Sequence, residues 1–284
     1  MLKGVGTLKL RGRARTWGDP RTLTVTRKDG RWYASVVVDC IPKRQAGEEA
    51  TGLDWGVESF ATLADGERIE NPRVLAQAEA ALTRAQRDLS RKIGPRGRRK
   101  PSQNWLKAKA RVSALHRKVT NQRTEFLHQQ SAALVSRFSW IATEKLQIAG
   151  MTASAKGSIK EPGNNVQQKA GLNRAILDTA PSAFLSMLAY KAEEAGGVVA
   201  WVDTRKWKPS QTCPECWRVV KKPLSQRMHI CECGRVMHRD HASALVQLKV
   251  SLGLAGREPA PCGGGTEPPS KHETASKAAD FGGA

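Results

Sequence analysis

Two closely spaced cysteine pairs constrain this chain more than any other feature of its sequence. Cys213 and Cys216 form the first pair, Cys231 and Cys233 form the second, and fourteen residues lie between the pairs. Zinc takes four thiolates in a tetrahedron, each about 2.3 Å from the metal, and two knuckles closed by a short hairpin can supply them. The alternative is four reduced thiols without a metal. Because both pairs are present, the spacing favours a zinc site.

An acid follows the second cysteine pair, and two further acids interrupt or end apolar segments elsewhere. Asp240 precedes a helical pattern over residues 242–250, Asp54 interrupts an apolar strand, and Glu144 ends the apolar segment 139–144. Clustered carboxylates raise one another's pKa values. Two Mg²⁺ ions about 4 Å apart would relieve that repulsion and support phosphodiester hydrolysis. For Asp54 the periodicity alone slightly favours a simpler interpretation, a solvent-facing aspartate on an edge strand.

The charge of the chain narrows its partners. Its 284 residues include 47 Lys and Arg against 26 Asp and Glu, a formal net charge of +21. A surplus of this size is more typical of a polyanion-binding protein than of general solubility. No segment resembles a signal peptide or reaches the ~20 apolar residues of a membrane span, and clustered cysteines fit a reducing compartment. We therefore expect a cytoplasmic protein that binds nucleic acid and no membrane.

A dense run of cations lies in the break between two predicted helices. The pattern over residues 74–138 predicts two antiparallel helices with a break at 93–101. A charge run is usually a solvated loop, but one this dense at the tip of a helical hairpin favours contact with phosphates. The candidate nucleic-acid-binding residues are Arg91, Lys92, Arg96, Arg98, Arg99 and Lys100.

The remaining pattern predicts an α/β layer. Strands are expected before and after the helices, with hairpin turns at 29–30 and 65–66. A loop over 151–170, a helix over 172–195 and a buried strand over 198–203 are expected to follow. The order strand, hairpin, strand, helices, strand, helix, strand, helix is that of an RNase H-like fold.

Several segments, in this order along the chain, resemble one protein family. G-L-D-W-G-V-E-S-F-A-T-L-A-D-G resembles the first RuvC motif of the transposon-encoded TnpB (OrfB) family, and A-T-E-K-L-Q-I-A-G-M resembles the second. V-D-T-R-K-W-K-P-S-Q-T-C-P-E-C resembles the start of the zinc ribbon, and C-G-R-V-M-H-R-D-H-A-S-A-L the third motif. The family comprises RNA-guided nucleases related to type V CRISPR effectors. The resemblance covers about residues 5–253.

The resemblance implies roles for the residues singled out above. Asp54, Glu144 and Asp240 would be catalytic and bind two Mg²⁺ ions, and the four cysteines would hold structural Zn²⁺. The implied partners are guide RNA and target DNA, and the implied location is the prokaryotic cytosol or nucleoid. The implied fold is α/β, an RNase H-like (RuvC) nuclease core with an inserted helical hairpin, a zinc ribbon and an N-terminal partial β-barrel segment.

Composition, apolar periodicity and the resemblance together predict a division of the chain into domains. These are a partial wedge-like β segment over 1–48, the RuvC-like core over 49–208 with the basic hairpin 74–138, the zinc ribbon over 209–237, the third-motif helix over 238–253 and a disordered tail over 254–284.

The chain departs from the family pattern at several positions. The third motif is typically Asp-Arg-Asp-x-Asn-Ala-Ala, whereas His238, Ala242 and Ser243 stand at the first, fifth and sixth places here. Losing the asparagine removes a polar neighbour of the metal site, a change that can cost 10–100-fold in affinity or activity. Trp217 replaces the usual glycine after the first knuckle, and Lys145 replaces the acid beside Glu144. Family members are also usually longer at the amino end.

The sequence therefore leaves two main functions open. The first is an RNA-guided, Mg²⁺-dependent DNA endonuclease of the TnpB class. The second is a cleavage-deficient nucleic-acid-binding protein, either repressor-like or a truncated transposon remnant. A transposase that joins DNA strands is a weaker third interpretation, because nothing in the sequence supplies strand-transfer chemistry of its own.

Overall fold

The computed structural model describes residues 18–255, except for Asp29, Pro42, Arg98, Ile159 and Leu224. The predictions made above for residues 1–17, Asp29, Arg98 and the tail from residue 256 lie outside the described residues. The chain divides into two compact units. One contains Met1–Arg44 and Ala78–Thr120, and the other contains Gln45–Gln77 and Asn121–Ala284. None of the described helices contains an apolar stretch of membrane-spanning length.

A five-stranded mixed sheet in the order β5-β4-β3-β6-β7 forms the centre of the second unit. β3 pairs antiparallel with β4 and parallel with β6, so it lies inside the sheet. β4 pairs antiparallel with β5, and β6 pairs parallel with β7. The fold is therefore mixed α/β. The strands are β3 (Glu49–Trp55), β4 (Ser59–Leu63), β5 (Arg68–Glu70), β6 (Phe138–Glu144) and β7 (Val198–Val202).

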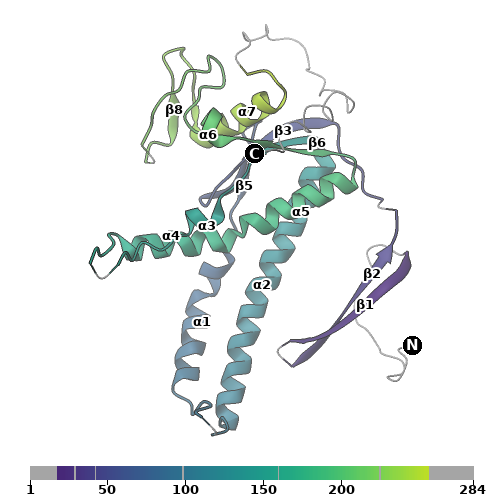
Figure 1. The fold of residues 1–284 in the computed structure, drawn as a ribbon, viewed down its shortest axis with the longest axis vertical. Helices are drawn as coiled ribbons and strands as arrows, with labels where there is room; N and C mark the ends of the chain where they lie inside the picture. Colours follow the sequence, from purple (N-terminus) through teal and green to yellow (C-terminus); the bar gives the residue numbers. More distant parts are fainter. Residues whose placement is uncertain are drawn as a thin grey trace. The chain divides into compact units, whose positions relative to one another are not determined.

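Successive residues of β3 face opposite sides of the sheet, as the pleat requires. Leu53 is fully buried in the hydrophobic core on one side. Gly52 and Asp54 face the other side, where α7 (Arg239–Ser251) crosses the sheet (Figure 1). A Cβ added at Gly52 would lie 1.8 Å from the carbonyl oxygen of Ala244 in α7. The missing side chain of Gly52 therefore lets the backbone of α7 approach the centre of the sheet.

Helices cover the core side of the sheet. α5 (Pro181–Glu194) contacts β7, and the last turns of α2 (Gln103–Arg137) add further apolar side chains. Phe60 from β4 makes edge-to-face contacts with Phe126 and Phe184, at centroid distances of 4.9 and 4.7 Å. The core residues from these elements include Leu53, Phe60, Leu63, Leu134, Val135, Ile141, Phe184 and Leu188.

The predicted helical hairpin is confirmed. α1 (Val74–Ser90) and α2 run side by side and are joined by a short connection at their far ends (Figure 1). Leu82 and Ala85 of α1, and Ala108 and Val119 of α2, are buried, and the apolar pattern that predicts the two helices includes all four. The break predicted over 93–101 falls between the two helices.

Two expectations for the later part of the chain are wrong. The predicted loop over 151–170 is shorter, because α4 (Val166–Thr179) begins inside it. The helical prediction for residues 172–195 is otherwise confirmed: Pro181 begins α5, and Ala180, with φ 47°, separates α4 from α5. The strand predicted as buried, β7, exposes 49% of Trp201. β7 pairs on one side only and forms an edge of the sheet, a position that an apolar run does not reveal.

Two small antiparallel pairs complete the described strands. β1 (Asp19–Lys28) pairs with β2 (Arg31–Asp39), and Gly30, with φ +75°, lies in the turn between them. β8 (Met228–Ile230) pairs with β9 (Val236–His238) beside the cysteine pairs. Two single-turn helices are α3 (Ile148–Met151) and α6 (Thr204–Trp207).

Candidate active site and metal centre

The three predicted acids lie around one cavity. Asp54 near the end of β3, Glu144 at the end of β6 and Asp240 in the first turn of α7 all line a cavity of about 560 Å³. The cavity also has cationic side chains, from Lys208, Arg227 and Arg239. Residues separated by up to 186 positions in the sequence are thus brought together by the sheet and by α7.

The register of the parallel strands places two of the acids beside each other. Leu53 of β3 pairs with Thr143 of β6, and the Thr143 hydroxyl donates to the Leu53 carbonyl oxygen at 3.0 Å. Asp54 and Glu144 are the next residues on their strands, so both carboxylates lie at the same end of the sheet. The edge-strand interpretation of Asp54 is therefore wrong: β3 is an internal strand, and Asp54 is partly buried.

The start of α7 fixes the third acid. His238 caps the helix, because its Nδ1 accepts a hydrogen bond from the backbone N–H of Asp240 at 3.2 Å. An N-cap acceptor satisfies one of the donors that a helix start leaves free. The carboxylate of Asp240 belongs to the first helical turn, where the helix dipole favours negative charge.

Two polar residues of α7 bind Asp54 directly. The Ser243 hydroxyl donates to Asp54 Oδ1 at 2.6 Å, and Gln247 Nε2 donates to the same oxygen at 3.3 Å. Sequence reasoning noted Ser243 only as a departure from the family pattern, and it missed Gln247. The signal was present: residues 240, 243 and 247 are spaced three and four apart and so share one face of a helix.

The cavity raises the pKa values of two of its acids, Asp54 and Glu144. Burial raises the pKa of Asp54 well above its ordinary value, and the neighbouring carboxylates of Glu144 and Asp240 raise it further. The hydrogen bond from Ser243 and the charge of Arg239 act in the opposite direction. Burial also raises the pKa of Glu144. In the described part of the chain, no lysine or arginine forms an ion pair with Asp54 or Glu144, and the ion pair of Arg227 goes to Glu58 at 3.2 Å.

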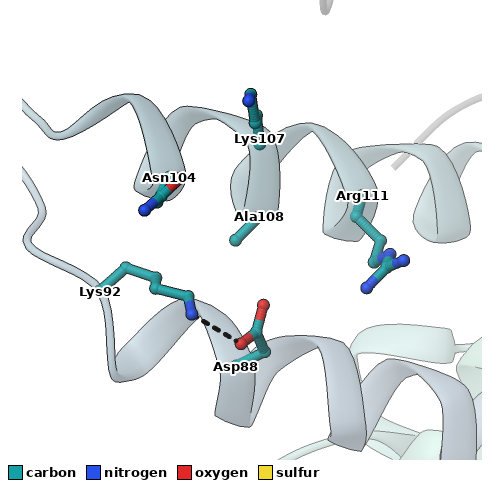
Figure 2. A pocket seen from close by; sticks show the side chains of 6 residues that line it. All are labelled: Asp88, Lys92, Asn104, Lys107, Ala108 and Arg111. Atoms are coloured by element: carbon teal, nitrogen blue, oxygen red, sulfur yellow. Dashed lines mark ion pairs between the residues drawn. The ribbon is translucent and has the colours of Figure 1, made fainter.

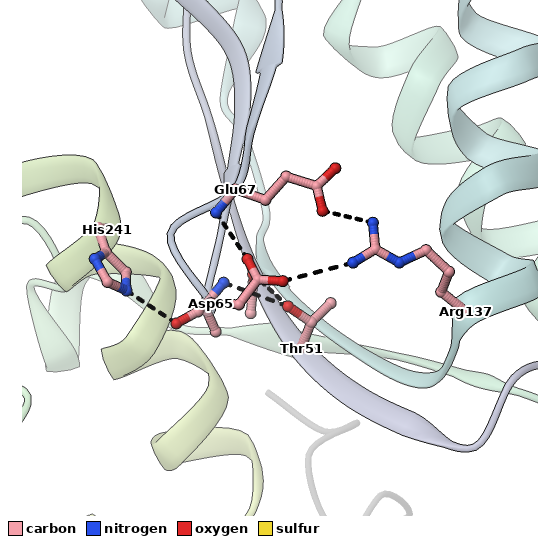
Figure 3. Close-up of polar contacts among 7 residues, drawn as sticks. Thr51, Asp65, Glu67, Arg137 and His241 are labelled. Atoms are coloured by element: carbon pink, nitrogen blue, oxygen red, sulfur yellow. Dashed lines mark hydrogen bonds and ion pairs between the residues drawn. The ribbon is translucent and has the colours of Figure 1, made fainter.

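A second anchor holds α7 beside the turn between β4 and β5 (Figure 3). His241 Nε2 donates to the carbonyl oxygen of Ala64 at 3.0 Å. On the other side of this turn, Arg137 binds Glu67 at 2.6 Å and Asp65 at 3.5 Å. His241, the residue after Asp240, therefore ties the start of α7 to the turn between β4 and β5. Arg137 of α2 binds the same turn.

The four cysteines gather as their spacing predicted. Their sulfur atoms all lie within 4.8 Å of one another, and the pairs Cys213–Cys233 and Cys216–Cys231 are 3.6 and 3.5 Å apart. Four ligands 2.3 Å from a tetrahedral zinc ion would lie about 3.8 Å apart. The donor set and its dimensions can thus hold a metal ion.

The knuckles show how the chain bends around the cysteines. Gly234 follows Cys233 with φ +90°, a conformation that glycine adopts freely. Trp217 occupies the corresponding place after Cys216 with φ +60°, although a bulky residue is strained there. Its ring packs edge-on against Trp207 at a centroid distance of 6.1 Å. The aromatic contact provides stabilisation that opposes the backbone strain.

The predicted nucleic-acid-binding residues surround the connection between α1 and α2. Arg91, Arg96, Arg99 and Lys100 are exposed, while Lys92 forms an ion pair with Asp88 at 3.1 Å. Lys92 and Asp88 also line a hollow of about 450 Å³ between the two helices (Figure 2). Lys107 and Arg111 of α2 also line the hollow; Arg111 points towards α1, whereas the ammonium group of Lys107 points away from it (Figure 2).

Comparisons with known proteins agree with the order of the acids and cysteines along the chain. A sequence profile of the OrfB_IS605 family, described as "Probable transposase", matches residues 24–155. A profile described as "Cas12f1-like, TNB domain" matches residues 182–246, which include all four cysteines and Asp240. The chain belongs to the TnpB (OrfB) family.

Curated relatives of this family cover most of the chain. A protein of Escherichia coli (strain K12) named "Putative RNA-guided DNA endonuclease InsQ" is 34% identical over 234 residues, which make up 81% of this chain and 56% of the relative. A "Putative RNA-guided DNA endonuclease" of Streptomyces pristinaespiralis is 34% identical over 254 residues, 88% of this chain and 56% of the relative. The chain thus spans little more than half the length of these relatives.

Solved structures give a more distant match. The structure titled "Cryo-EM structure of the Cas12f1-sgRNA-target DNA complex" aligns with a TM-score of 0.48 and 16% identity, over 76% of this chain and 41% of that chain.

The departures of this TnpB-family chain from the family's third motif can be located in the structure. His238 supplies the N-cap of α7, and Ala242 is 1% exposed. Ser243, next to Ala242, donates the short hydrogen bond to Asp54. Ser243, the residue after Ala242, therefore makes a polar contact with the acid cavity.

Proposed function

We propose that this chain is the nuclease core of an RNA-guided DNA endonuclease of the TnpB class. The observation that carries the proposal is the convergence of Asp54, Glu144 and Asp240 on one cavity. The names of the curated relatives, and an RNase H-like order of elements around the sheet, support the same function.

The donor set of the cavity suits magnesium. Hard divalent cations prefer oxygen ligands, and the partly buried carboxylates of Asp54 and Glu144 form no ion pair with a lysine or arginine within the described residues. Burial, and to a lesser extent the neighbouring acids, raises the pKa of Asp54, and a bound cation would favour the ionised form of its carboxyl group. Asp54, Glu144 and Asp240 would hold the Mg²⁺ ions, which would supply an activated water and stabilisation of the leaving oxygen of a phosphodiester.

The chain's own residues would arrange the substrate around that chemistry. Arg227, Arg239 and Lys208 line the same cavity as the acids and are suited to phosphate oxygens. Ser243 and Gln247 hold Asp54. We propose Zn²⁺ for the four cysteines, as a structural ion that shapes the segment leading into α7. The exposed cations of the α1–α2 connection are proposed to bind the phosphates of guide RNA or target DNA.

A direct experiment tests this function. The chain is purified with the RNA that accompanies it, that RNA is sequenced, and the complex is incubated with Mg²⁺ and a DNA library that matches it. We expect cleavage that disappears in Asp240→Ala and persists in Asp65→Asn, which changes an acid outside the cavity. Cleavage that survives Asp240→Ala would refute the assignment of the acids.

One observation favours a second candidate, a binding protein without cleavage. The motif asparagine is absent, and the alanine in its place is buried and offers no polar group. This candidate predicts a bound RNA and salt-dependent DNA binding, with no product that depends on Mg²⁺.

A further inference from the structure

We propose that Ser243 and Gln247 are positioning residues that hold the Asp54 carboxylate for a divalent cation. The inference rests on the proposed function and concerns residues to which the family's third motif gives no polar role. Both act through Asp54, since their polar groups bind its Oδ1 atom.

The two side chains form a connected donor set beneath the carboxylate. Ser243 Oγ lies 2.6 Å from Asp54 Oδ1, and Gln247 Nε2 lies 3.3 Å from Oδ1 and 3.4 Å from Ser243 Oγ. Ser243 is 2% exposed, and Gln247 is fully buried. Two donors on the same oxygen restrict rotation of the carboxylate and leave Oδ2 without a hydrogen bond among the described residues.

The same helix sets the position of a second acid. Asp240, Ser243 and Gln247 share one face of α7, and the close approach at Gly52 fixes the height of that helix above β3. Any shift of α7 would therefore move Asp240 and reorient Asp54 together. Such coupling maintains the relative placement of two carboxylates that must bind the same ions.

Stability alone does not account for these polar residues. Ser243 and Gln247 are as buried as the apolar residues Ala242, Ala244 and Val246 of the same helix. Gln247 Oε1 is buried and lacks a hydrogen-bond partner in the described structure, a situation that typically costs about 1–3 kcal/mol. An apolar residue would avoid that cost. The presence of Gln247 next to Asp54 is typical of a site where geometry is maintained at the expense of folding stability.

The position of Ser243 also compensates for a change in the family motif. The motif is typically Asn-Ala-Ala where this chain has Ala242, Ser243 and Ala244. The polar group has moved by one residue along the helix, to a position from which its hydroxyl reaches Asp54. Ser243 thus supplies a polar contact with Asp54 that the methyl group of Ala242 cannot make.

The test measures Mn²⁺ binding to the full, zinc-loaded chain by electron paramagnetic resonance of free Mn²⁺, without nucleic acid. We expect Asp54→Ala to abolish the binding and Ser243→Ala to weaken it roughly 10–100-fold. Gln247→Met, which keeps the length of the side chain, should weaken it less, because its hydrogen bond is longer. Ser243→Thr keeps the hydroxyl and should bind more tightly than Ser243→Ala. Ser251→Ala removes a hydroxyl from the same helix that bonds Trp140 rather than Asp54, and should bind like the wild type.

The outcomes separate this inference from the proposed function. If the wild type and Asp54→Ala bind Mn²⁺ equally, the acids are not a metal site and both proposals fail. If Asp54→Ala loses binding while Ser243→Ala and Gln247→Met retain wild-type affinity, only the positioning role is wrong. If the affinity of Ser251→Ala falls as far as that of Ser243→Ala, the effect is a general loosening of α7, which also overturns the positioning role. Circular dichroism of each variant establishes that it is folded.

Discussion

At the scale of single residues, the buried carboxyl group of Asp54 lowers the folding stability of the chain. Its pKa is raised by burial and by two neighbouring acids, so ionisation at pH 7 opposes folding. We predict that Asp54→Asn raises the melting temperature of the zinc-loaded chain by about 3 °C or more in buffer without Mg²⁺. Adding Mg²⁺ should narrow that gap, because only the wild type gains binding energy.

Differential scanning fluorimetry at pH 7 measures both effects. Asp65→Asn is the matched control, since Asp65 is half exposed and forms an ion pair with Arg137. The control should leave the melting temperature unchanged or lower it. A lower melting temperature for Asp54→Asn would show that Asp54 stabilises the fold.

His238 has a role at this scale that its place in the motif does not suggest. It replaces an aspartate of the family pattern, yet it still caps α7 through Nδ1. We predict that His238→Ala lowers the free energy of unfolding by about 1 kcal/mol, and that His238→Asn restores it, because asparagine is a strong N-cap. Urea denaturation monitored by circular dichroism provides the comparison. Equal stability of the alanine and asparagine variants would contradict a capping role.

The sequence identified the acids of the cavity but not their surroundings. An aspartate in an apolar strand gives the same period-2 pattern whether the strand lies at the edge of a sheet or inside the sheet under a helix. The pattern alone therefore favours an exposed edge strand for Asp54, which is wrong. Ser243 and Gln247 were not predicted as its partners, because a hydrogen bond across 189 residues depends on how α7 lies on the sheet. Cys213 and Cys231, by contrast, were predictable, since local spacing alone brings metal ligands together.

At the scale of elements, the contact between α7 and β3 organises the cavity. Gly52 permits this contact, because a Cβ there would lie 1.8 Å from the Ala244 carbonyl oxygen. We predict that Gly52→Ala lowers the free energy of unfolding by about 3 kcal/mol and also weakens Mn²⁺ binding, since α7 must move away from the sheet.

Gly171→Ala in α4 is the matched control, because nothing lies within 4 Å of its added Cβ. It should raise the free energy of unfolding by about 0.4–1 kcal/mol. Urea denaturation of the two variants distinguishes the local clash from a general effect of losing a glycine. A Gly52→Ala protein as stable as the wild type would mean that α7 has room to shift.

The element order was predictable from turns and periodicity, whereas the exposure of the edge strand β7 was not. The hairpin turn at Gly66 and the two arms of the helical hairpin follow from local residue preferences. The exposure of Trp201 on β7 does not, since it depends on whether another strand pairs beyond it. Local patterns thus predict which elements form, and packing decides which of their faces are covered.

At the scale of the whole molecule, the cysteine cluster is coupled to the acid cavity. The segment that follows the second cysteine pair runs through β9 directly into α7, and Lys249 near the end of that helix donates to the Pro214 carbonyl oxygen at 2.8 Å. We predict that Cys213→Ser releases the structural metal and weakens Mn²⁺ binding at the acids by at least 10-fold. Metal content by atomic emission and Mn²⁺ titration are measured on the same samples. Cys40→Ser, which changes an exposed free cysteine, should alter neither. Unchanged Mn²⁺ affinity after loss of the first metal would show that the two centres are independent.

The cations of the α1–α2 connection should control affinity for nucleic acid without affecting the acid cavity. Arg96 and Arg99 are exposed, are joined to each other through backbone hydrogen bonds, and form no ion pair within the described part of the chain. If each contacts one phosphate, Arg96→Gln/Arg99→Gln should make the slope of log affinity against log salt shallower by about 1.4–1.8, the contribution of two released counterions. Fluorescence anisotropy with labelled RNA and DNA between 50 and 300 mM salt measures the slope.

The control Arg21→Gln/Arg218→Gln removes the same charge from residues already paired with Asp39 and Glu232, so its slope should change less. Equal slopes for the two double variants would mean that net charge alone, rather than the connection, determines binding.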